Sequence, residues 1–190
     1  MRVISLSSLS APSAVPMRLL NWVLRTLAHL LLQEQVLTLH RNLLRLRASY
    51  RQNLSGILPT NLRQALIAAE DHRFFNHGGV DPIALLRAIV RFHLRGRLQG
   101  ASTIEQQLVR TVTMRYDRTV RRKTREVLLA TCVGEVLTKS EVAGVYAMVA
   151  YYGWRMEGLG RACQSLGLRL SLLSTFEAAS LVARLKYPQP

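Results

Sequence analysis

The chain is poor in acidic residues, and this shortage sets its charge. Only 11 residues are Asp or Glu against 26 Lys and Arg, so the formal net charge is +15. Lysine is scarce too, since all basic residues except Lys123, Lys139 and Lys186 are arginine. Such a balance indicates an anionic partner such as phospholipid headgroups, a pyrophosphate or nucleic acid, and arginine forks suit phosphate oxygens. Because no recognised nucleic-acid motif accompanies the charge, we expect no nucleic-acid partner.

Cysteine is almost absent. The two cysteines, Cys132 and Cys163, lack the spacing of a sequence-encoded metal site. We interpret each as a small buried residue rather than as half of a disulfide.

Strand-like alternation of polar and apolar residues is also missing, whereas helical periodicity is sustained along the chain. With 190 residues, 49% of them hydrophobic, the chain can build one domain with a sizeable core. A second domain of ordinary size has no room. We therefore predict a single, mainly α domain.

No uninterrupted apolar run of membrane-spanning length occurs. A spanning helix needs about 20 mostly apolar residues. The apolar segment 17–46 is broken by charged and titratable side chains, namely Arg25, His29, Glu34, His40 and Arg41. We predict a membrane-associated helix over residues 17–49, amphipathic and lying in the membrane interface with Trp22 as an anchor. A short or tilted span and a core helix remain as alternatives. Residues 1–16, rich in Ser, Ala and Pro, are expected to form a disordered tail.

A carboxylate pair, Glu70 and Asp71, ends an alanine-rich segment. Thr60 or Asn61 is expected to cap a helix that runs through Ala69 and delivers Glu70. A carboxylate at the end of an apolar helix is costly to desolvate and can have a raised pKa, which suits general acid or base chemistry. Asp81-Pro82 predicts the start of the next helix, over residues 83–94. Arg87, Arg91 and Arg95 lie four positions apart on one face of this helix. We interpret Arg91 and Arg95 as part of a solvated face.

A second polar cluster follows Gly100, where Ser102 or Thr103 can cap a helix and Gln106 falls about one turn later. Further along, a basic run over residues 121–125 precedes Glu126 and an apolar helical segment. By spacing alone, the first two clusters are ordinary helix starts and the basic run is a solvated segment.

Together these clusters resemble the signature motifs of the peptidoglycan glycosyltransferases, family fifty-one, the transglycosylase module of penicillin-binding proteins and their monofunctional relatives. The pattern Glu-Asp-x-x-Phe-x-x-His-x-Gly-x-Asp is matched by Glu70, Asp71, Phe74, His77, Gly79 and Asp81. The pattern Gly-Gly-Ser-Thr-Ile-Thr-Gln-Gln-Leu is matched in part by Gly100, Ser102, Thr103, Ile104, Gln106, Gln107 and Leu108. The pattern Arg-Lys-x-x-Glu-x-x-x-Ala is matched by Arg122, Lys123, Glu126 and Ala130. The resemblance covers about residues 55–188.

The resemblance implies a mainly α fold over residues 50–190, with a lysozyme-like globular head and a smaller membrane-facing jaw. It implies polymerisation of lipid II, in which the acceptor's 4-hydroxyl attacks the anomeric carbon of a growing glycan chain. Undecaprenyl pyrophosphate leaves and the anomeric configuration inverts. The expected location is the periplasmic face of the inner membrane. The expected partners are lipid II, the nascent glycan chain, membrane lipid and a transpeptidase or division and elongation proteins. At this length the transpeptidase domain of bifunctional relatives is expected to be absent.

The resemblance also implies roles for individual residues. Glu70 would be the general base. Glu126, with Arg122 and Lys123, would neutralise the departing pyrophosphate; no cofactor is required, although Glu126 could hold a divalent Mg or Mn ion. The remaining substrate-binding residues implied are Asp71, Ser102, Thr103, Gln106, Gln107, Arg110 and Arg118.

Four residues depart from the family pattern: Ala101, Glu105, Gly134 and Met148. They leave open a weakly active or inactive membrane-bound module that binds lipid II or glycan. A lysozyme-like fold also leaves open a glycan-cleaving enzyme, although a basic approach to Glu126 is not needed for an uncharged leaving group. Because both glutamates are retained, polymerisation is the main prediction.

Overall fold

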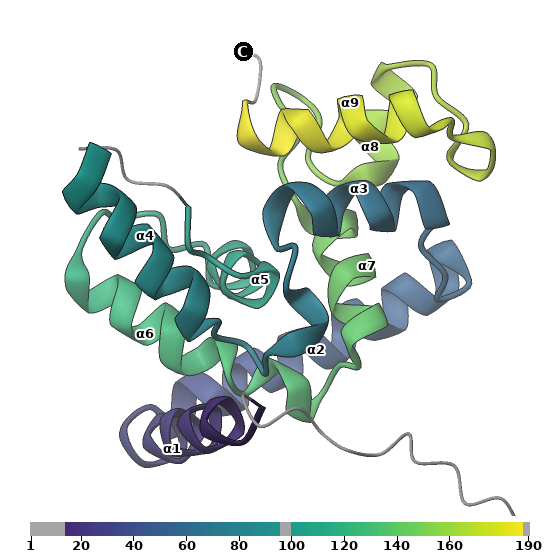
Figure 1. Cartoon of the computed structure of the whole chain (residues 1–190). Helices are drawn as coiled ribbons and strands as arrows, with labels where there is room; N and C mark the ends of the chain where they lie inside the picture. Colours follow the sequence, from purple (N-terminus) through teal and green to yellow (C-terminus); the bar gives the residue numbers. More distant parts are fainter. Residues whose placement is uncertain (1–13, 96–99, 188–190) are drawn as a thin grey trace, which may run out of the picture.

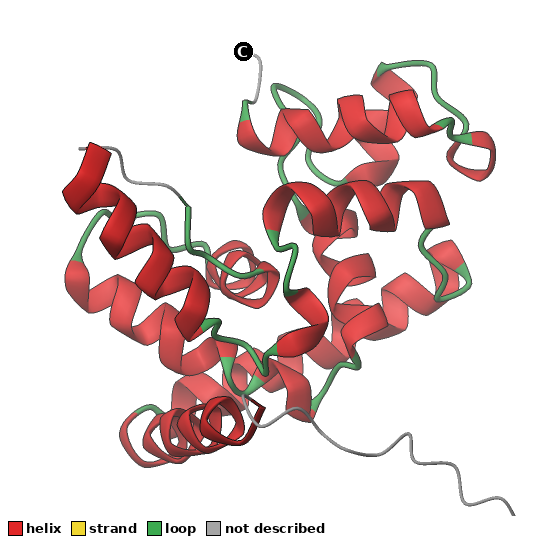
Figure 2. Ribbon diagram, in the orientation of Figure 1, coloured by secondary structure: helices red, strands yellow, loops and turns green. Residues whose placement is uncertain are grey.

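The computed structural model of the chain describes residues 14–95 and 100–187. These residues form helices joined by loops, coloured along the chain in Figure 1 and by structure type in Figure 2. The α-helices are α1 (Ala14–Leu31), α2 (Gln33–Leu54), α3 (Thr60–Glu70), α4 (Pro82–Arg95), α5 (Ile104–Thr113), α6 (Val120–Ala130), α7 (Lys139–Val149), α8 (Leu159–Ser165) and α9 (Thr175–Lys186). Short 3-10 turns are η1 (Phe74–Asn76), η2 (Val133–Glu135) and η3 (Leu170–Leu172). Within the described ranges there is no named strand, which confirms the mainly α prediction.

The segment predicted as one helix over 17–49 is divided in two at Leu32, whose backbone (φ −133°, ψ 28°) is not helical. Helix α1 already includes residues 14–16, so that part of the predicted tail is helical; residues 1–13 lie outside the described residues. The two helices differ in burial. Large apolar side chains of α1 such as Leu19, Trp22 and Leu30 are exposed, at 60%, 56% and 73%.

Helix α2 is a core helix. Its side chains Val36, Leu39, Leu43 and Tyr50 recur three, four and seven positions apart and are each at most 1% exposed. This spacing places them on one helical stripe, which packs into the main hydrophobic cluster of the protein. Residues 33–54 are therefore part of the domain's core.

Helix α7 lies at the centre of the fold. Its residues from Glu141 to Ala147 are all buried, and it contacts α2, α3, α5 and α8. Helix α3 packs along α9, and Figure 1 shows this pair on the opposite side of the molecule from α4. The apolar core thus connects the side formed by α3 and α9 with the side formed by α4. Helices α3, α4 and α5 bring the predicted motif residues toward the space between these two sides.

Helix α4 is amphipathic but, like α1, exposes much of its apolar surface. Leu85, Leu86 and Leu94 are 50%, 62% and 77% exposed. None of the described helices combines the length and the apolar character that crossing a bilayer requires.

Candidate functional site

A cavity of about 770 Å³ lies between the two sides of the fold. The last residues of α3 and the two residues after it, Ala68 to His72, line one side together with the end of α9. Helix α4 lines the other side. The start of the second motif, residues 100–103, also lines it, together with Gln107 on α5. The cavity therefore joins the first and second sequence motifs in one hollow.

The helices that bring Glu70 and Gln106 to the site begin or end where the sequence predicts. Helix α3 ends at Glu70, although its N-cap is Pro59 and not Thr60 or Asn61. The predicted cap of the second motif is confirmed, because Thr103 Oγ1 accepts a hydrogen bond from the Gln106 amide at 3.2 Å. Helix α4 begins at Pro82, as predicted.

Asp71 and Thr103 clamp the first two motifs together. The Asp71 carboxylate accepts the backbone N–H of Ile104 at 3.2 Å and lies 3.0 Å from His77 Nε2. Thr103 Oγ1 donates to the carbonyl of Gly79 at 2.6 Å. Both side chains are buried, at 8% and 1% exposure, so their polar groups are engaged within the protein. We infer that these two residues hold the walls of the cavity in place, and both also line it.

The first motif also meets the third. Gly79 has φ +115°, and a Cβ atom there would lie 2.4 Å from the carbonyl oxygen of Ala130 at the end of α6. Only glycine allows this conformation and this close approach of two backbones. The glycine of motif one thus sets the position of α6, which carries Glu126.

Glu70 is held at the cavity by a chain of two hydrogen bonds. Gln107 Nε2 donates to Glu70 Oε2 at 2.8 Å, and Tyr146 donates its hydroxyl to Gln107 Oε1 at 2.6 Å. Burial, reinforced by the Glu70 charge, raises the pKa of Tyr146, so its hydroxyl stays protonated and can donate. The second carboxylate oxygen, Glu70 Oε1, is buried and has no hydrogen-bond partner within the described residues. The two carboxylate oxygens of Glu70 are therefore in different surroundings.

Glu126 lies at the centre of a cluster of three cations. Arg110 binds it with Nε 2.9 Å from Oε2 and Nη2 3.1 Å from Oε1, Lys123 Nζ lies 2.6 Å from Oε1, and Arg122 Nη1 binds Oε2. Burial acts to raise the pKa of Glu126, but hydrogen bonds from Arg110 and Lys123 outweigh burial and hold that pKa below its usual value. Glu126 is therefore ionised at neutral pH.

In this cluster the carboxylate is buried and the three cationic side chains are more exposed. The Glu126 side chain is 3% exposed, whereas those of Arg122, Arg110 and Lys123 are 14%, 32% and 39% exposed. Three cationic side chains thus surround one buried carboxylate, so the cluster carries more positive than negative formal charge. Such a surface can bind a di-anionic group such as a pyrophosphate.

Lys123 connects this cluster to the second motif. Its Nζ donates to Ser102 Oγ at 3.0 Å and to Gln106 Oε1 at 2.7 Å, as well as to Glu126. Ser102 itself lines the large cavity. Lys123 therefore lies at the junction between the cavity and the cation cluster.

Comparison with known proteins identifies the family. A family model described as Transglycosylase matches residues 39–190. The chain belongs to the transglycosylase family. This confirms the resemblance seen in the motifs, and the match begins inside α2, in agreement with the place of that helix in the core.

The curated relatives of this transglycosylase include much longer proteins. Penicillin-binding protein 1A of Escherichia coli is 39% identical over 133 residues, which are 69% of this chain and 16% of that protein. Penicillin-binding protein 1F of Bacillus subtilis is 31% identical over 175 residues, 85% of this chain and 24% of that protein. A protein of Cupriavidus necator named as a transglycosylase is 37% identical over 134 residues, 70% of this chain and 58% of that protein. The chain thus spans about a sixth of the Escherichia coli protein and more than half of the Cupriavidus one.

The departure at Glu105 is compensated within the fold. Glu105 is 3% exposed, and its Oε1 lies 2.5 Å from Lys139 Nζ at the start of α7. The Lys139 ammonium also lies 4.1 Å from the centre of the Phe74 ring, a cation–π contact. A charged residue replaces a small hydroxyl at this transglycosylase position, and a lysine from another helix neutralises it.

The other departures lie away from the Glu70 carboxylate contacts. Gly134 is exposed, and the adjacent Glu135 pairs with His29 and His40 rather than with cavity residues. Met148 is half-buried and packs against the core. Ala101 lines the cavity. These positions leave the contacts of Glu70 and Glu126 intact.

The surroundings of Glu126 do not fit a divalent metal. Mg²⁺ and Mn²⁺ favour several oxygen ligands, whereas this carboxylate is saturated by three cationic side chains. Two groups of side chains in the described parts of the chain have metal-ligand geometry, and neither includes Glu126. One of them, Asp71, His77 and Glu105, is buried beside Lys139 and forms part of the internal network described above.

Arg118 and Arg91 lie differently with respect to the cavity. Arg118 is exposed between α5 and α6, and the described contacts do not join it to the cavity. Arg91 is exposed, as expected of a solvated face, yet it also lines the cavity with Arg87. The side chain of Arg95 is outside the described side chains.

Sequence reasoning gave no role to several residues that the fold brings to the site. Arg87 Nη1 lies 3.2 Å from His72 Nε2, and both residues line the cavity. Tyr146 orients Gln107 from α7. His72 occupies a variable position of the first motif, which carries no signal.

Proposed function

We propose that this transglycosylase polymerises lipid II into the glycan strands of peptidoglycan. The 4-hydroxyl of the acceptor attacks the anomeric carbon of the growing chain, the configuration inverts, and undecaprenyl pyrophosphate leaves. The observation that carries the proposal is the state of Glu70. One of its oxygens is fixed by Gln107, and the other is buried without a partner at a cavity of about 770 Å³.

Glu70 acts as the general base in this proposal. A base must offer an oxygen within hydrogen-bond reach of the acceptor hydroxyl, and Oε1 is the atom left for it. Gln107 is in turn oriented by Tyr146, so the carboxylate is held in one position before substrate binds. The proton of the attacking hydroxyl goes to Glu70 as the new glycosidic bond forms.

Arg122 and Lys123 stabilise the leaving pyrophosphate. Negative charge grows on the bridging oxygen as the glycosidic C–O bond breaks, and preorganised cations lower the free energy of that transition state. Glu126 acts as a positioning residue, because its buried carboxylate holds Arg110, Arg122 and Lys123 in place. Ser102 and Gln106 orient Lys123 at the junction with the cavity. None of these steps uses a metal.

The proposal includes a location at the membrane. Lipid II and undecaprenyl pyrophosphate are anchored in lipid, so the protein would work at the periplasmic face of the inner membrane. Exposed apolar side chains on α1 and α4 and the net charge of +15 support contact with anionic lipid. A transpeptidase, or proteins of the division and elongation machineries, would take the glycan product.

Incubation of the purified chain with lipid II in detergent micelles tests the function. The expected products are glycan polymer, seen as a ladder on a gel, and released undecaprenyl pyrophosphate. Binding of lipid II without polymer would instead indicate an inactive binding module. Shortening of preformed glycan strands would indicate a glycan-cleaving enzyme.

A further inference from the structure

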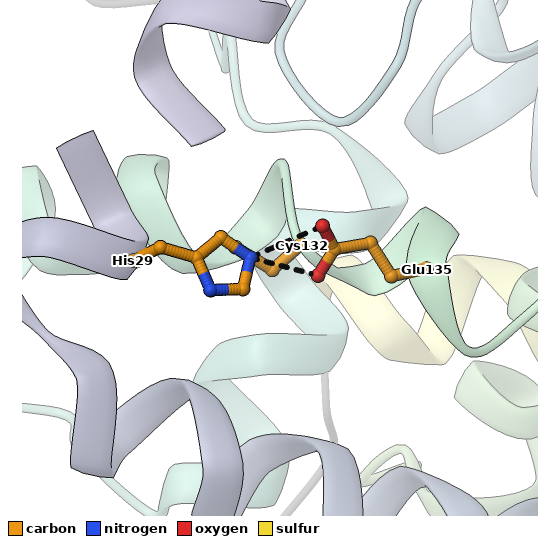
Figure 3. A group of neighbouring side chains, drawn as sticks. All are labelled: His29, Cys132 and Glu135. Atoms are coloured by element: carbon orange, nitrogen blue, oxygen red, sulfur yellow. Dashed lines mark hydrogen bonds and ion pairs between the residues drawn. The ribbon is translucent and has the colours of Figure 1, made fainter. Parts of the chain in front are cut away.

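A cluster of nitrogen, sulfur and oxygen donors lies outside the cavity, where three segments of the chain meet. His29 comes from α1, His40 from α2, Cys132 from the turn after α6, and Glu135 from η2. Figure 3 shows the His29 ring facing both carboxylate oxygens of Glu135, and Cys132 is labelled between these two side chains in the view. These residues are far apart in sequence, and the transglycosylase chemistry proposed above uses none of them.

The ligand atoms of His29, Cys132 and Glu135 form one close group, and His40 lies at its edge. His40 Nε2 also lies 3.3 Å from the carbonyl oxygen of Cys132. His29 Nε2 lies 3.1 Å from each oxygen of Glu135, and His40 Nε2 lies 3.2 Å from Glu135 Oε2. Ligand atoms of His29, Cys132 and Glu135 all lie within 4.8 Å of one another. In a tetrahedral zinc site, with metal–ligand distances of about 2.0–2.3 Å, ligand atoms are about 3.3–3.8 Å apart. To reach this spacing, ligand atoms at the 4.8 Å limit would approach one another by about 1 Å as the ion binds.

We propose that His29, His40, Cys132 and Glu135 bind a Zn²⁺ ion. The class of metal follows from the ligands. Thiolate and imidazole favour zinc and other borderline or soft ions, whereas Mg²⁺ and Ca²⁺ require mainly oxygen. Two neutral imidazoles, one thiolate and one carboxylate balance the charge of a divalent ion. The buried Cys132, at 0% exposure, supplies the innermost ligand, and the half-exposed His29 leaves an entry path from solvent.

Arg25 is the one described positive side chain that must give way. Its Nε lies 3.8 Å from Glu135 Oε1, and its side chain is 40% exposed, so it can turn into solvent when the ion enters. The ion would then neutralise Glu135 in place of Arg25.

The site would act as a clamp on the N-terminal helix. It joins α1 to α2 and to the end of α6, the helix that carries Glu126. Since α1 has an exposed apolar face, zinc would fix the orientation of that face relative to the domain. A ligand that binds only the folded protein raises its thermal stability.

Metal titration of the full chain, free of any affinity tag and treated with chelator, tests this site. Competition against a chromophoric chelator should show one Zn²⁺ per chain, and the melting temperature should rise with Zn²⁺ but not with Mg²⁺. Replacement by Co²⁺ should add a thiolate-to-metal charge-transfer band. Cys132→Ser should remove that band, and the matched control Cys163→Ser, at the other buried cysteine, should keep it.

His29→Ala and His40→Ala should each weaken Zn²⁺ binding at least ~10-fold, by the general sensitivity of metal sites to loss of a ligand-shell group. His29 is exposed, so His29→Ala tests the site even if Cys132→Ser does not fold. Equal Zn²⁺ affinity in His29→Ala and wild type would overturn the proposal. Loss of binding in Glu105→Gln, with His29→Ala unaffected, would also overturn it and place the ion in the buried group of Asp71, His77 and Glu105.

Discussion

Gln106 and Gln107 are consecutive on α5, yet their side-chain amides contact different charged groups of the site. Gln106 Oε1 accepts from Lys123 Nζ at 2.7 Å, and Gln107 Nε2 donates to Glu70 Oε2 at 2.8 Å. Adjacent side chains on a helix diverge by about 100°, so one short helix can hold two groups at a fixed separation. In the proposed reaction these groups are the base and the leaving-group cation.

Glu70→Gln should abolish polymerisation and leave the fold intact. The amide keeps the size and the contact with Gln107 but cannot take the acceptor's proton, and general-base catalysis is worth ~10²–10⁴-fold. The measurement is the rate of lipid II polymerisation, with circular dichroism as the folding check. The matched control is Glu157→Gln, at a carboxylate that is 57% exposed, which should change the rate less than about twofold. Polymer formation by Glu70→Gln at close to the wild-type rate would remove Glu70 from the mechanism.

Lys123→Ala should slow polymerisation ~10²–10³-fold at fixed ionic strength, because one preorganised group is lost from the transition state. Lipid II binding, measured in parallel, should fall much less. Arg161→Ala is the control, since Arg161 forms an exposed ion pair with Glu157 at 3.0 Å, and exposed pairs contribute little. Arg91 is unsuitable as the control because it lines the cavity. Equal small effects at Lys123 and Arg161 would refute the pyrophosphate role.

Lys139→Met should destabilise the protein by about 3–5 kcal/mol, because it leaves the Glu105 carboxylate buried and unpaired. Adding Glu105→Thr to that variant should recover much of the loss, since no buried charge then remains. Urea unfolding of the wild type, the two single variants and the double variant forms a double-mutant cycle. Additive effects of the two substitutions would show that the pair is not coupled.

Glu141 should make stability depend on pH in the acid range. Hydrogen bonds from Arg47, the Thr138 backbone and Arg51 outweigh burial and lower the pKa of Glu141 from 4.5 to about 2. The unfolded chain therefore binds the proton more tightly, and this stabilisation is present above about pH 4.5 and lost as the pH falls toward about 2. The shift corresponds to roughly 3 kcal/mol.

The variant Glu141→Gln isolates this effect. It should be less stable than wild type at pH 7 by about that amount, roughly 3 kcal/mol, and the difference should disappear toward pH 2. Urea unfolding at several pH values measures both quantities. A difference that stays constant over this range would exclude the Glu141 carboxylate as its source.

Membrane association should depend on α1. Changing Leu19, Trp22 and Leu30 together to Gln should weaken liposome binding at least ~10-fold without unfolding the protein, because all three side chains are more than half exposed. Salt should weaken binding of the wild type only in part, since screening reduces the arginine attraction but not apolar burial. Full sedimentation of the variant with liposomes would place the anchor elsewhere, and α4 is the next surface to test.

A matched set of exposed apolar residues provides the control for this experiment. Ile57, Leu172 and Phe176 are 73%, 63% and 81% exposed and lie outside α1 and α4. Changing them together to Gln should leave liposome binding unchanged.

Local patterns in the sequence determined most helix boundaries at the site. The helix that ends at Glu70, the start at Pro82 and the cap at Thr103 depend on residues within about one turn of each other, and propensity and capping act over that range. The motifs also drew attention to Glu70, Glu126 and Lys123, which the fold places at the cavity and in the cation cluster.

Tertiary structure alone decided which distant residues meet. Glu105 pairs with Lys139, 34 positions away, Gln107 with Tyr146, 39 away, and His29 with Glu135, 106 away. The place of α2 also depends on tertiary structure. Its charged and apolar residues are compatible with both a membrane surface and a core, and in the fold α5, α6 and α7 contact this helix. Such contacts depend on how whole helices pack. The hydrophobic effect that drives this packing is non-directional, so the residue type at one position does not indicate which distant residue it will contact.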